Sequence, residues 1–296
     1  MEVLDLLQAS LLDLLYELRD QEIRLIVGGG YGLYLKQRHL RETGDRTLLQ
    51  LFPEARSTND LDLFLSTEVL ADSRRARLMA DALARLGCAP VEGARYLQFV
   101  RSVPTAWGVR EVKFDLLTGP PHPAVDLRLI KRDSRRWRPR GEKIPLHAHP
   151  APEAVGLEDE PLEISLRGRR TNGEEFVGSI FLPQPFTYTL MKLTAFRDRK
   201  DDPDKDLGRH HALDLYTILA TTTEQEWDTA CRLYREHQYE DAVQAAGTVV
   251  RIYFSGPEAL GALRLREHPL ASGGLDLDGF LSALHDLFHC GSEPGG

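Results

Sequence analysis

The chain has 296 residues, a formal net charge of −8 and 42% hydrophobic residues. This apolar share supports a packed core and excludes wholesale disorder, and the acidic balance argues against a protein that depends on non-specific nucleic-acid binding. No apolar run reaches the roughly 20 residues of a membrane span, so we expect no membrane segment.

The N-terminus is expected to form a helix over residues 3–20, because apolar residues recur there at helical spacing. The segment is acidic, unlike the basic start of a signal peptide. The three cysteines, Cys88, Cys231 and Cys290, are odd in number and far apart. They suggest neither a disulfide framework nor a zinc cluster, so we expect a protein of the reducing cytoplasm.

Helices and strands alternate along the first 117 residues. Hydrophobic periodicity predicts strands at 24–27, 60–65, 96–103 and 109–117, and helices at 31–41 and 68–86. Residues 118–160 are rich in Pro, Arg and His and are expected to form an irregular basic connection. A hairpin over 161–183, with Asn172-Gly173 in its turn, follows.

The chain beyond this hairpin is expected to be helical, at 185–199, 206–221, 224–237, 240–266 and 275–289. Thr223 and Asp276 stand where helix caps are expected. The predicted fold class is therefore α+β, with an N-terminal α/β domain at 1–183 and a helical domain at 184–296.

Two aspartates interrupt the apolar stretch "RSTNDLDLFL" (56–65). Because side chains alternate along a strand, Asp60 and Asp62 point to the same face. A divalent cation offsets the repulsion between them, and carboxylates suit Mg²⁺ or Mn²⁺. The alternative is that Asp60 caps the strand and Asp62 faces solvent.

A third carboxylate, Asp115, lies late in the strand at 109–117. If this strand pairs beside residues 60–65, all three acids meet at one edge of the sheet. In the alternative interpretation Asp115 is incidental.

The glycine run "VGGGYG" (27–32) follows a strand and opens a helix. Glycines there let a ligand approach the backbone, and the amides of a helix start favour phosphate. The run is neither a P-loop nor a dinucleotide fingerprint. Alone it indicates little more than a tight turn.

These motifs together resemble the nucleotidyltransferase superfamily with the DNA polymerase β-like fold, and within it the bacterial AbiEii/AbiGii toxin family. The resemblance rests on Gly29-Gly30, on Arg56, Thr58, Asp60 and Asp62, and on the later block "TYTLMKLTAFRDRKDDPDKDLGRHHALDLYTIL" (187–219). It covers about residues 22–220 and implies a mixed sheet with flanking helices, followed by a helical region.

The resemblance also implies roles for individual residues. Asp60, Asp62 and Asp115 would be catalytic and hold Mg²⁺ or Mn²⁺. The nucleotide would be bound by Gly29, Gly30, Thr58, Lys192, Arg199 and Lys205, with Arg56, Asp206 and Asp214 in support. His210 and His211 are a base or phosphate donor in one interpretation and structural in the other.

The implied activity is transfer of an NMP from an NTP to an acceptor hydroxyl, in a toxin or phage-defence component. Residues 128–143 carry eight Lys/Arg against two acids, with Trp137 among them. This composition favours RNA, such as tRNA, as the acceptor, although a solvated loop would look the same. An antitoxin or defence-complex protein is an expected partner. The alternatives are an inactive scaffold and a small-molecule nucleotidyltransferase of the antibiotic-modifying type.

Overall fold

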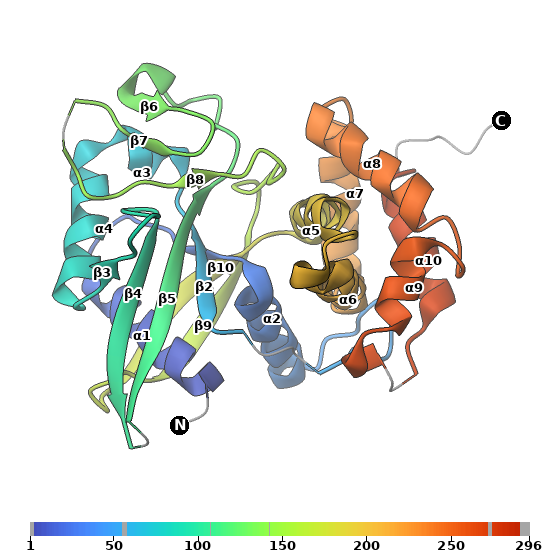
Figure 1. The fold of residues 1–296 in the computed structure, drawn as a ribbon, viewed down its shortest axis with the longest axis horizontal. Coiled ribbons are helices and arrows are strands. Elements are labelled where there is room, and N and C mark those ends of the chain that lie inside the picture. The colour runs from blue at the N-terminus through green and yellow to red at the C-terminus, as the bar shows by residue number, and fades with distance from the viewer. Residues whose placement is uncertain (1–2, 55–57, 107, 142, 272–273, 291–296) are drawn as a thin grey trace. The chain divides into compact units, whose positions relative to one another are not determined.

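The computed structural model describes residues 3–54, 58–106, 108–141, 143–271 and 274–290 (Figure 1). Its chain divides into two compact units, which are treated separately below. Unit 1 comprises Met1–Gly32, Ser57–Ala151 and Glu160–Leu182, and unit 2 comprises Leu33–Arg56, Pro152–Asp159 and Pro183–Gly296. The expected domain boundary after residue 183 lies beside the break at Leu182, whereas residues 33–56 and 152–159 pack with the helical unit.

Unit 1 is built on a mixed sheet with the strand order β3-β4-β5-β2-β1-β10-β9, and β8 pairs with β5. The strands are β1 (Ile26–Val27), β2 (Asp60–Phe64), β3 (Ala89–Pro90), β4 (Gln98–Thr105), β5 (Gly108–Thr118), β8 (His149–Pro150), β9 (Leu162–Arg169) and β10 (Glu175–Leu182). Strand β2 is parallel to β5 and antiparallel to β1. The predicted α+β class, with a mixed sheet and a helical C-terminal region, is confirmed.

One face of this sheet is covered by helix α1 (Val3–Leu18). The side chains of Leu61 on β2 and Phe114 on β5 are fully buried on that face. Arg101 of β4 also lies on that face and donates to Asp13 of α1 at 2.7 Å. The opposite face therefore carries the residues that alternate with Leu61 and Phe114.

Where one helix was expected at 68–86, the structure has α3 (Thr67–Ala71) and α4 (Ser73–Arg85). Asp72 separates them, because its side chain accepts the N–H groups of Arg74 and Arg75 and so caps α4. Such local side-chain bonds compete with the helix, and hydrophobic periodicity does not record them.

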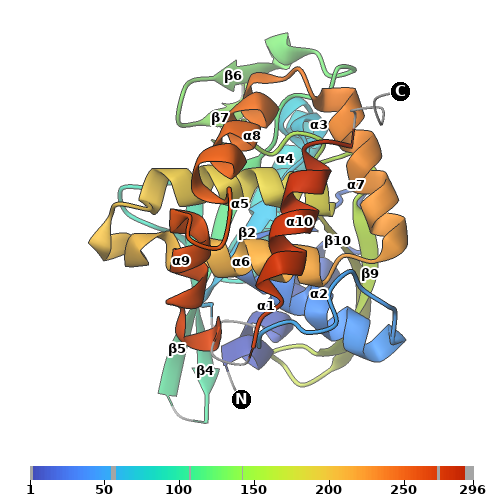
Figure 2. The same ribbon diagram turned by 90° about the vertical axis from the view of Figure 1, so that its right-hand side faces the viewer.

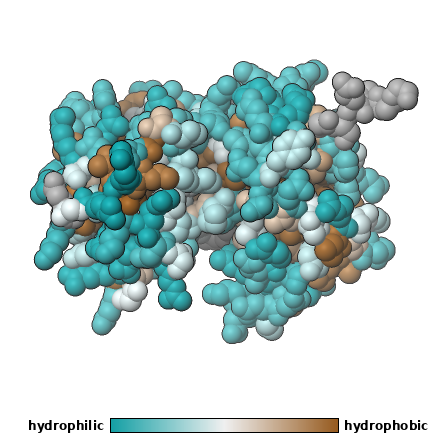
Figure 3. All heavy atoms as spheres, turned by 90° about the horizontal axis from the view of Figure 1, so that it is seen from above, coloured by the Kyte–Doolittle hydropathy of each residue, from teal (hydrophilic) through white to brown (hydrophobic). Residues whose placement is uncertain are grey.

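The basic connection contains η1 (Leu127–Leu129) and a short hairpin of β6 (Ile130–Arg132) and β7 (Trp137–Pro139). Its cations are mostly exposed, and Arg132 lies over the Trp137 ring at 5.6 Å. Figure 3, seen from above, shows hydrophilic residues around a hydrophobic patch in its left-hand part.

Unit 2 is helical, and helices α5 and α6 run side by side in it (Figure 2). Helix α2 (Gly29–Thr43) begins in unit 1 and continues into unit 2. The further elements are α5 (Pro185–Arg199), η2 (Pro203–Gly208), α6 (Arg209–Ala220), α7 (Glu224–His237), α8 (Asp241–Tyr253), α9 (Leu260–Arg266), η3 (Pro269–Ala271) and α10 (Leu277–Leu287). The helix expected at 240–266 is thus two helices, and the break contains Gly256-Pro257. Within the described residues, no helix has both the length and the apolar character of a membrane span.

The expectation of no disulfide is wrong, because Cys231 of α7 and Cys290 are bonded with a Cα–Cα distance of 5.4 Å. The two residues are 59 positions apart, and only the packing of α10 against α7 brings them together. Cys88 is free and buried.

A buried ion pair joins α2 to the start of α7 within unit 2. Lys36 Nζ lies 2.5 Å from Glu226 Oε1, and both side chains are buried. The other oxygen of Glu226 accepts the backbone N–H of Thr223 and so closes a capping box. The expected cap at Thr223 is confirmed, and so is that at Asp276.

We predict that Glu226→Gln lowers the free energy of unfolding by about 3 kcal/mol, because it leaves the Lys36 ammonium buried without its counter-charge. Glu224→Gln, in the first turn of the same helix but exposed, is the matched control and should change stability by less than about 0.5 kcal/mol. Urea denaturation measures both. Equal losses would show that the buried pair is not the stabilising feature.

Candidate active site

Three carboxylates lie on the face of the unit 1 sheet opposite to the one that α1 covers. The parallel register of β2 and β5 places Asp62 opposite Asp115 and Asp60 opposite Lys113. Residues 60 and 62 share a face because side chains alternate, and cross-strand partners share a face as well. The structure therefore brings together the three acids that the sequence singled out.

The glycine turn lies directly against this site. The N–H of Gly28 donates to the Asp62 carbonyl at 2.8 Å. Gly29 has φ +61°, and a Cβ atom there would stand 1.7 Å from Asp62 Oδ2. Only glycine fits both the backbone angle and this contact. Gly29 thus lets the first turn of α2, whose partial positive charge favours an anion, approach the Asp62 carboxylate.

Thr58 orients Asp60. Its side chain is buried, and Oγ1 donates to Asp60 Oδ1 at 2.5 Å. The structure thus places Thr58 against a carboxylate of the site, whereas the resemblance implied a contact with the nucleotide. Arg56, predicted to support the site, lies outside the described residues.

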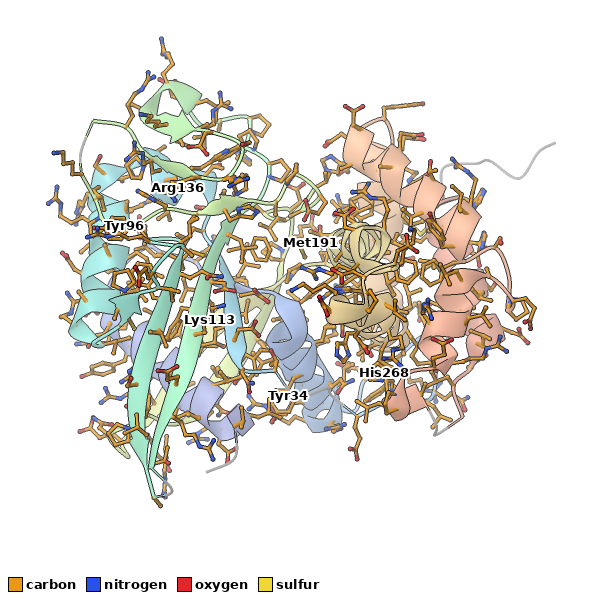
Figure 4. All side chains as sticks on the ribbon, in the orientation of Figure 1. Tyr34, Tyr96, Lys113, Arg136, Met191 and His268 are labelled. Atoms are coloured by element: carbon orange, nitrogen blue, oxygen red, sulfur yellow. A yellow bond between two sulfur atoms is a disulfide. The ribbon has the colours of Figure 1, made fainter. Side chains whose placement is uncertain are left out.

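Several neighbours act on the charge of Asp115. Burial raises the pKa of this carboxyl above its ordinary value of 3.8, Lys113 lowers it, the charge of Asp60 raises it, and a hydrogen bond from Gln98 lowers it. Lys113 Nζ lies 3.9 Å from Asp115 Oδ1 (Figure 4 labels Lys113 on β5). Burial is the largest of these effects, so the pocket disfavours the charged form.

The donor set fits a hard divalent cation. Asp115 Oδ1 is buried, and among the described residues no group donates a hydrogen bond to it. Asp60 and Asp62 add two further carboxylates on the same face. An all-oxygen set of this kind suits Mg²⁺ or Mn²⁺ rather than a metal that prefers nitrogen or sulfur.

A cavity of about 1040 Å³ opens beside Asp60 in unit 1. Its walls combine apolar side chains with charges of both signs. The lining residues are Val3, Leu6, Asn59, Asp60, Pro90, Val91, Glu92, Val100, Thr105, Arg110, Glu111 and Lys113. Strands β4 and β5 contribute to it, whereas the Gly28–Gly29 turn follows β1 on the other side of β2. A nucleoside-sized group could therefore lie on the far side of the acids from the glycines.

The cations predicted to bind the nucleotide belong to unit 2, and two of them already have partners there. Lys192 is buried and donates to Asp214 at 2.7 Å. Arg199 donates to His211 Nε2 at 2.6 Å. Lys205 is exposed on η2.

The other predicted supporting acid, Asp206, accepts a hydrogen bond from Arg209. Of the two acids predicted to support the site, Asp214 therefore accepts a hydrogen bond from Lys192, whereas Asp206 pairs with Arg209.

Two residues of the site were not predicted from the sequence. The charge of Lys113 acts on Asp115, and the Gln98 side chain forms a hydrogen bond with the Asp115 carboxyl. Lys113 stands two positions before Asp115, so strand alternation already places it on the same face. Gln98 has no comparable signal, because only the β4–β5 pairing puts it opposite Asp115.

Comparison with known proteins adds a distant structural likeness. No family model matches the chain, and no curated protein matches it. An antigenic nucleotidyltransferase-like protein from Paracoccidioides brasiliensis aligns with a TM-score of 0.42 and 16% identity, over 87% of this chain and 93% of that one. These values are too low to assign an activity to the present chain, and the AbiEii/AbiGii resemblance stays a prediction.

We predict that Gly29→Ala destabilises the protein more than Gly87→Ala. Both glycines have positive φ, and an alanine at such a position costs about 1–2 kcal/mol. Nothing lies within 4 Å of a Cβ at Gly87, whereas a Cβ at Gly29 would overlap Asp62. The difference between the two variants in chemical denaturation, expected to exceed about 1 kcal/mol, measures the Asp62 contact. Equal losses would contradict this close approach.

We predict that Asp115→Asn stabilises the metal-free protein at neutral pH. The folded-state pKa of Asp115 is raised above 3.8, so its charged form opposes folding. This penalty is absent below the unfolded pKa and appears as pH rises through the folded pKa. The gain over wild type should therefore vanish in acid, in denaturation curves recorded with a chelator from about pH 3 to 7. The exposed Asp81→Asn on α4 is the control. A gain that persists at pH 3 would contradict this assignment.

Proposed function

We propose that this chain is a metal-dependent nucleotidyltransferase that transfers an NMP from an NTP to an acceptor hydroxyl. The observation that carries the proposal is the placement of Asp60, Asp62 and Asp115 on one sheet face, with Asp62 directly against Gly29 at the start of α2. Stable folding gives no reason to gather three carboxylates in this way, whereas phosphoryl transfer does.

In this proposal each part of the site has one task. Asp60, Asp62 and Asp115 hold Mg²⁺ or Mn²⁺, which supplies charge neutralisation for the triphosphate. The backbone at Gly29 and Gly30 binds phosphate oxygens at the helix start. Lys192, Arg199 and Lys205 remain proposed phosphate contacts. Lys192 has two N–H groups besides the one that it donates to Asp214.

The transfer needs positioning more than covalent chemistry. The acceptor oxygen forms a bond to the α-phosphorus, and the bond from that phosphorus to the bridging oxygen breaks, so that pyrophosphate leaves. The hydroxyl proton passes to the carboxylate of Asp115, which stands on the same face as Asp60 and Asp62.

RNA, such as a tRNA, is the acceptor that the basic hairpin favours. The exposed cations of residues 128–143 offer phosphate contacts, and Trp137 offers a stacking surface. Among the described residues of this segment, the ion pairs are limited to Arg128 with Asp126. A role as a toxin or phage-defence component, with an antitoxin as partner, is part of the proposal and rests on the family resemblance alone. A cytoplasmic location is also proposed, but the Cys231–Cys290 disulfide removes the cysteine argument for it.

A small-molecule acceptor is the second candidate, and the cavity beside Asp60 favours it. Its lining carries three acids and two bases, a near balance of charge that suits a compact acceptor better than a polyanion. An inactive scaffold is a weaker alternative, because a protein without catalysis has no use for three costly carboxylates.

The test is incubation with each α-labelled NTP, Mg²⁺, and either total tRNA or a small-molecule extract. We predict labelled product with wild type and a loss of about 100-fold or more in Asp60→Asn and Asp62→Asn, because each removes a ligand charge. Asp81→Asn, exposed on α4, should retain activity. Label in RNA supports the first acceptor class, and label in a small product supports the second.

A thermal-shift screen with NTPs and Mg²⁺ separates binding from transfer. Stabilisation by one nucleotide, lost in Asp60→Asn, with no labelled product in any extract would favour the scaffold. No labelled product and no stabilisation, with variants indistinguishable from wild type, would overturn the proposed function.

A further inference from the structure

A second group of ligand-type side chains lies within unit 2, apart from the carboxylates of unit 1. Asp206, His210 and His268 each direct one potential ligand atom to a common point, and these atoms all lie within 4.8 Å of one another. His210 Nδ1 is 2.9 Å from His268 Nε2 and 3.6 Å from Asp206 Oδ2. Figure 4 labels His268, which follows α9.

The backbone adopts left-handed dihedral angles at Asp206 and the two residues that follow it. Asp206 and Leu207 have φ of +56° and +52°, and Gly208 follows with +73°. Non-glycine residues rarely adopt such angles, and they persist where the surroundings hold them. The bend places Asp206 one turn before His210 at the start of α6.

The carboxylate of Asp206 is also oriented by a neighbour. Arg209 donates to Oδ1, which leaves Oδ2 turned to His210. A hydrogen-bonded carboxylate of this kind is typical of a metal ligand held by its outer shell.

The ligand set differs in chemistry from the three aspartates of unit 1. Two imidazoles and one carboxylate suit zinc and related first-row metals, with water in a remaining position. Metal–ligand bonds of about 2.0–2.1 Å in a tetrahedral site separate ligand atoms by roughly 3.3 Å. The distances of 2.9 Å and 3.6 Å fall on either side of this value, so small side-chain rotations suffice for these pairs.

Binding an ion requires one internal rearrangement at His268. Its Nδ1 accepts the Leu270 N–H at 3.1 Å, so in the ion-free state Nε2 carries the ring proton and donates to His210 Nδ1. An ion on Nε2 needs that proton on Nδ1, which opens the bond to Leu270. One backbone hydrogen bond and the His210–His268 bond are thus exchanged for three ion–ligand bonds.

We propose that Asp206, His210 and His268 bind one divalent transition-metal ion of the zinc class. The ion would join the turn before α6 to the turn after α9, two segments of unit 2 that are about sixty residues apart in sequence. The site is independent of the proposed transferase reaction, and its nitrogen ligands make it selective against Mg²⁺.

The test is calorimetric titration of the full, tag-free chain with Zn²⁺ in excess Mg²⁺. We expect one Zn²⁺ per chain and a more than roughly tenfold weaker affinity in His210→Ala and Asp206→Asn. His210 is exposed, so its replacement should leave the fold intact. His149→Ala removes an exposed histidine of unit 1 and should bind Zn²⁺ like wild type. Hydrogen exchange of the Leu270 amide should become faster with Zn²⁺.

Three results would overturn the proposal. These are no Zn²⁺ binding by wild type, equal affinity in wild type and His210→Ala, or a loss of binding in Asp60→Asn and Asp62→Asn instead. None of them bears on nucleotide transfer, which the labelled-NTP experiment tests separately.

Discussion

The mutual repulsion of Asp60, Asp62 and Asp115 is the constraint on which the rest of unit 1 depends. The β2–β5 register fixes these carboxylates on one face, where like charges oppose folding. Each acid has a different compensating neighbour. Thr58 donates to Asp60, Gln98 and Lys113 lower the pKa of Asp115, and the start of α2 lies against Asp62. Because the compensation of Asp115 remains incomplete, the site favours the arrival of a cation.

The glycine turn brings the partial positive charge of a helix start close to one of these carboxylates. Gly29 lets the amides of the first turn of α2 stand beside Asp62, where helix-start charge stabilises a carboxylate. The same amides are the groups that a phosphate would use. A metal ion on the acids would neutralise their negative charge, and a phosphate at the helix start would accept hydrogen bonds from its amides. This complementarity is the physical basis for proposing a nucleotide as the ligand.

The sequence indicated the candidate carboxylates, but it did not indicate most of the residues that contact them. Strand alternation alone placed Asp60 and Asp62 on one face, whereas the neighbourhood of Asp115 was conditional on a strand pairing that no local pattern encodes. The same alternation argument places Lys113 on this face, although Lys113 is not among the predicted residues. The Cys231–Cys290 bond depends on tertiary packing of two distant helices, so residue spacing carried no signal for it.

Helix boundaries also depend on contacts that hydrophobic periodicity does not record. Periodicity predicted one helix at 68–86, but the Asp72 cap divides it. Lys192 and Asp214 were both singled out, yet their pairing follows from the packing of α5 on α6. The candidate site residues were therefore visible in the sequence, and their partners became visible only in the fold.

Binding of Mn²⁺ followed by electron paramagnetic resonance tests the central claim most directly, because it observes the ion at the carboxylates without requiring an acceptor. With a non-hydrolysable NTP analogue present, wild type should bind Mn²⁺ tightly, and Asp62→Asn and Asp115→Asn should each weaken binding at least about tenfold. Asp81→Asn, an exposed position on α4, should leave this binding unchanged. Equal Mn²⁺ affinity in wild type, Asp62→Asn and Asp115→Asn would contradict a metal site built on these three carboxylates.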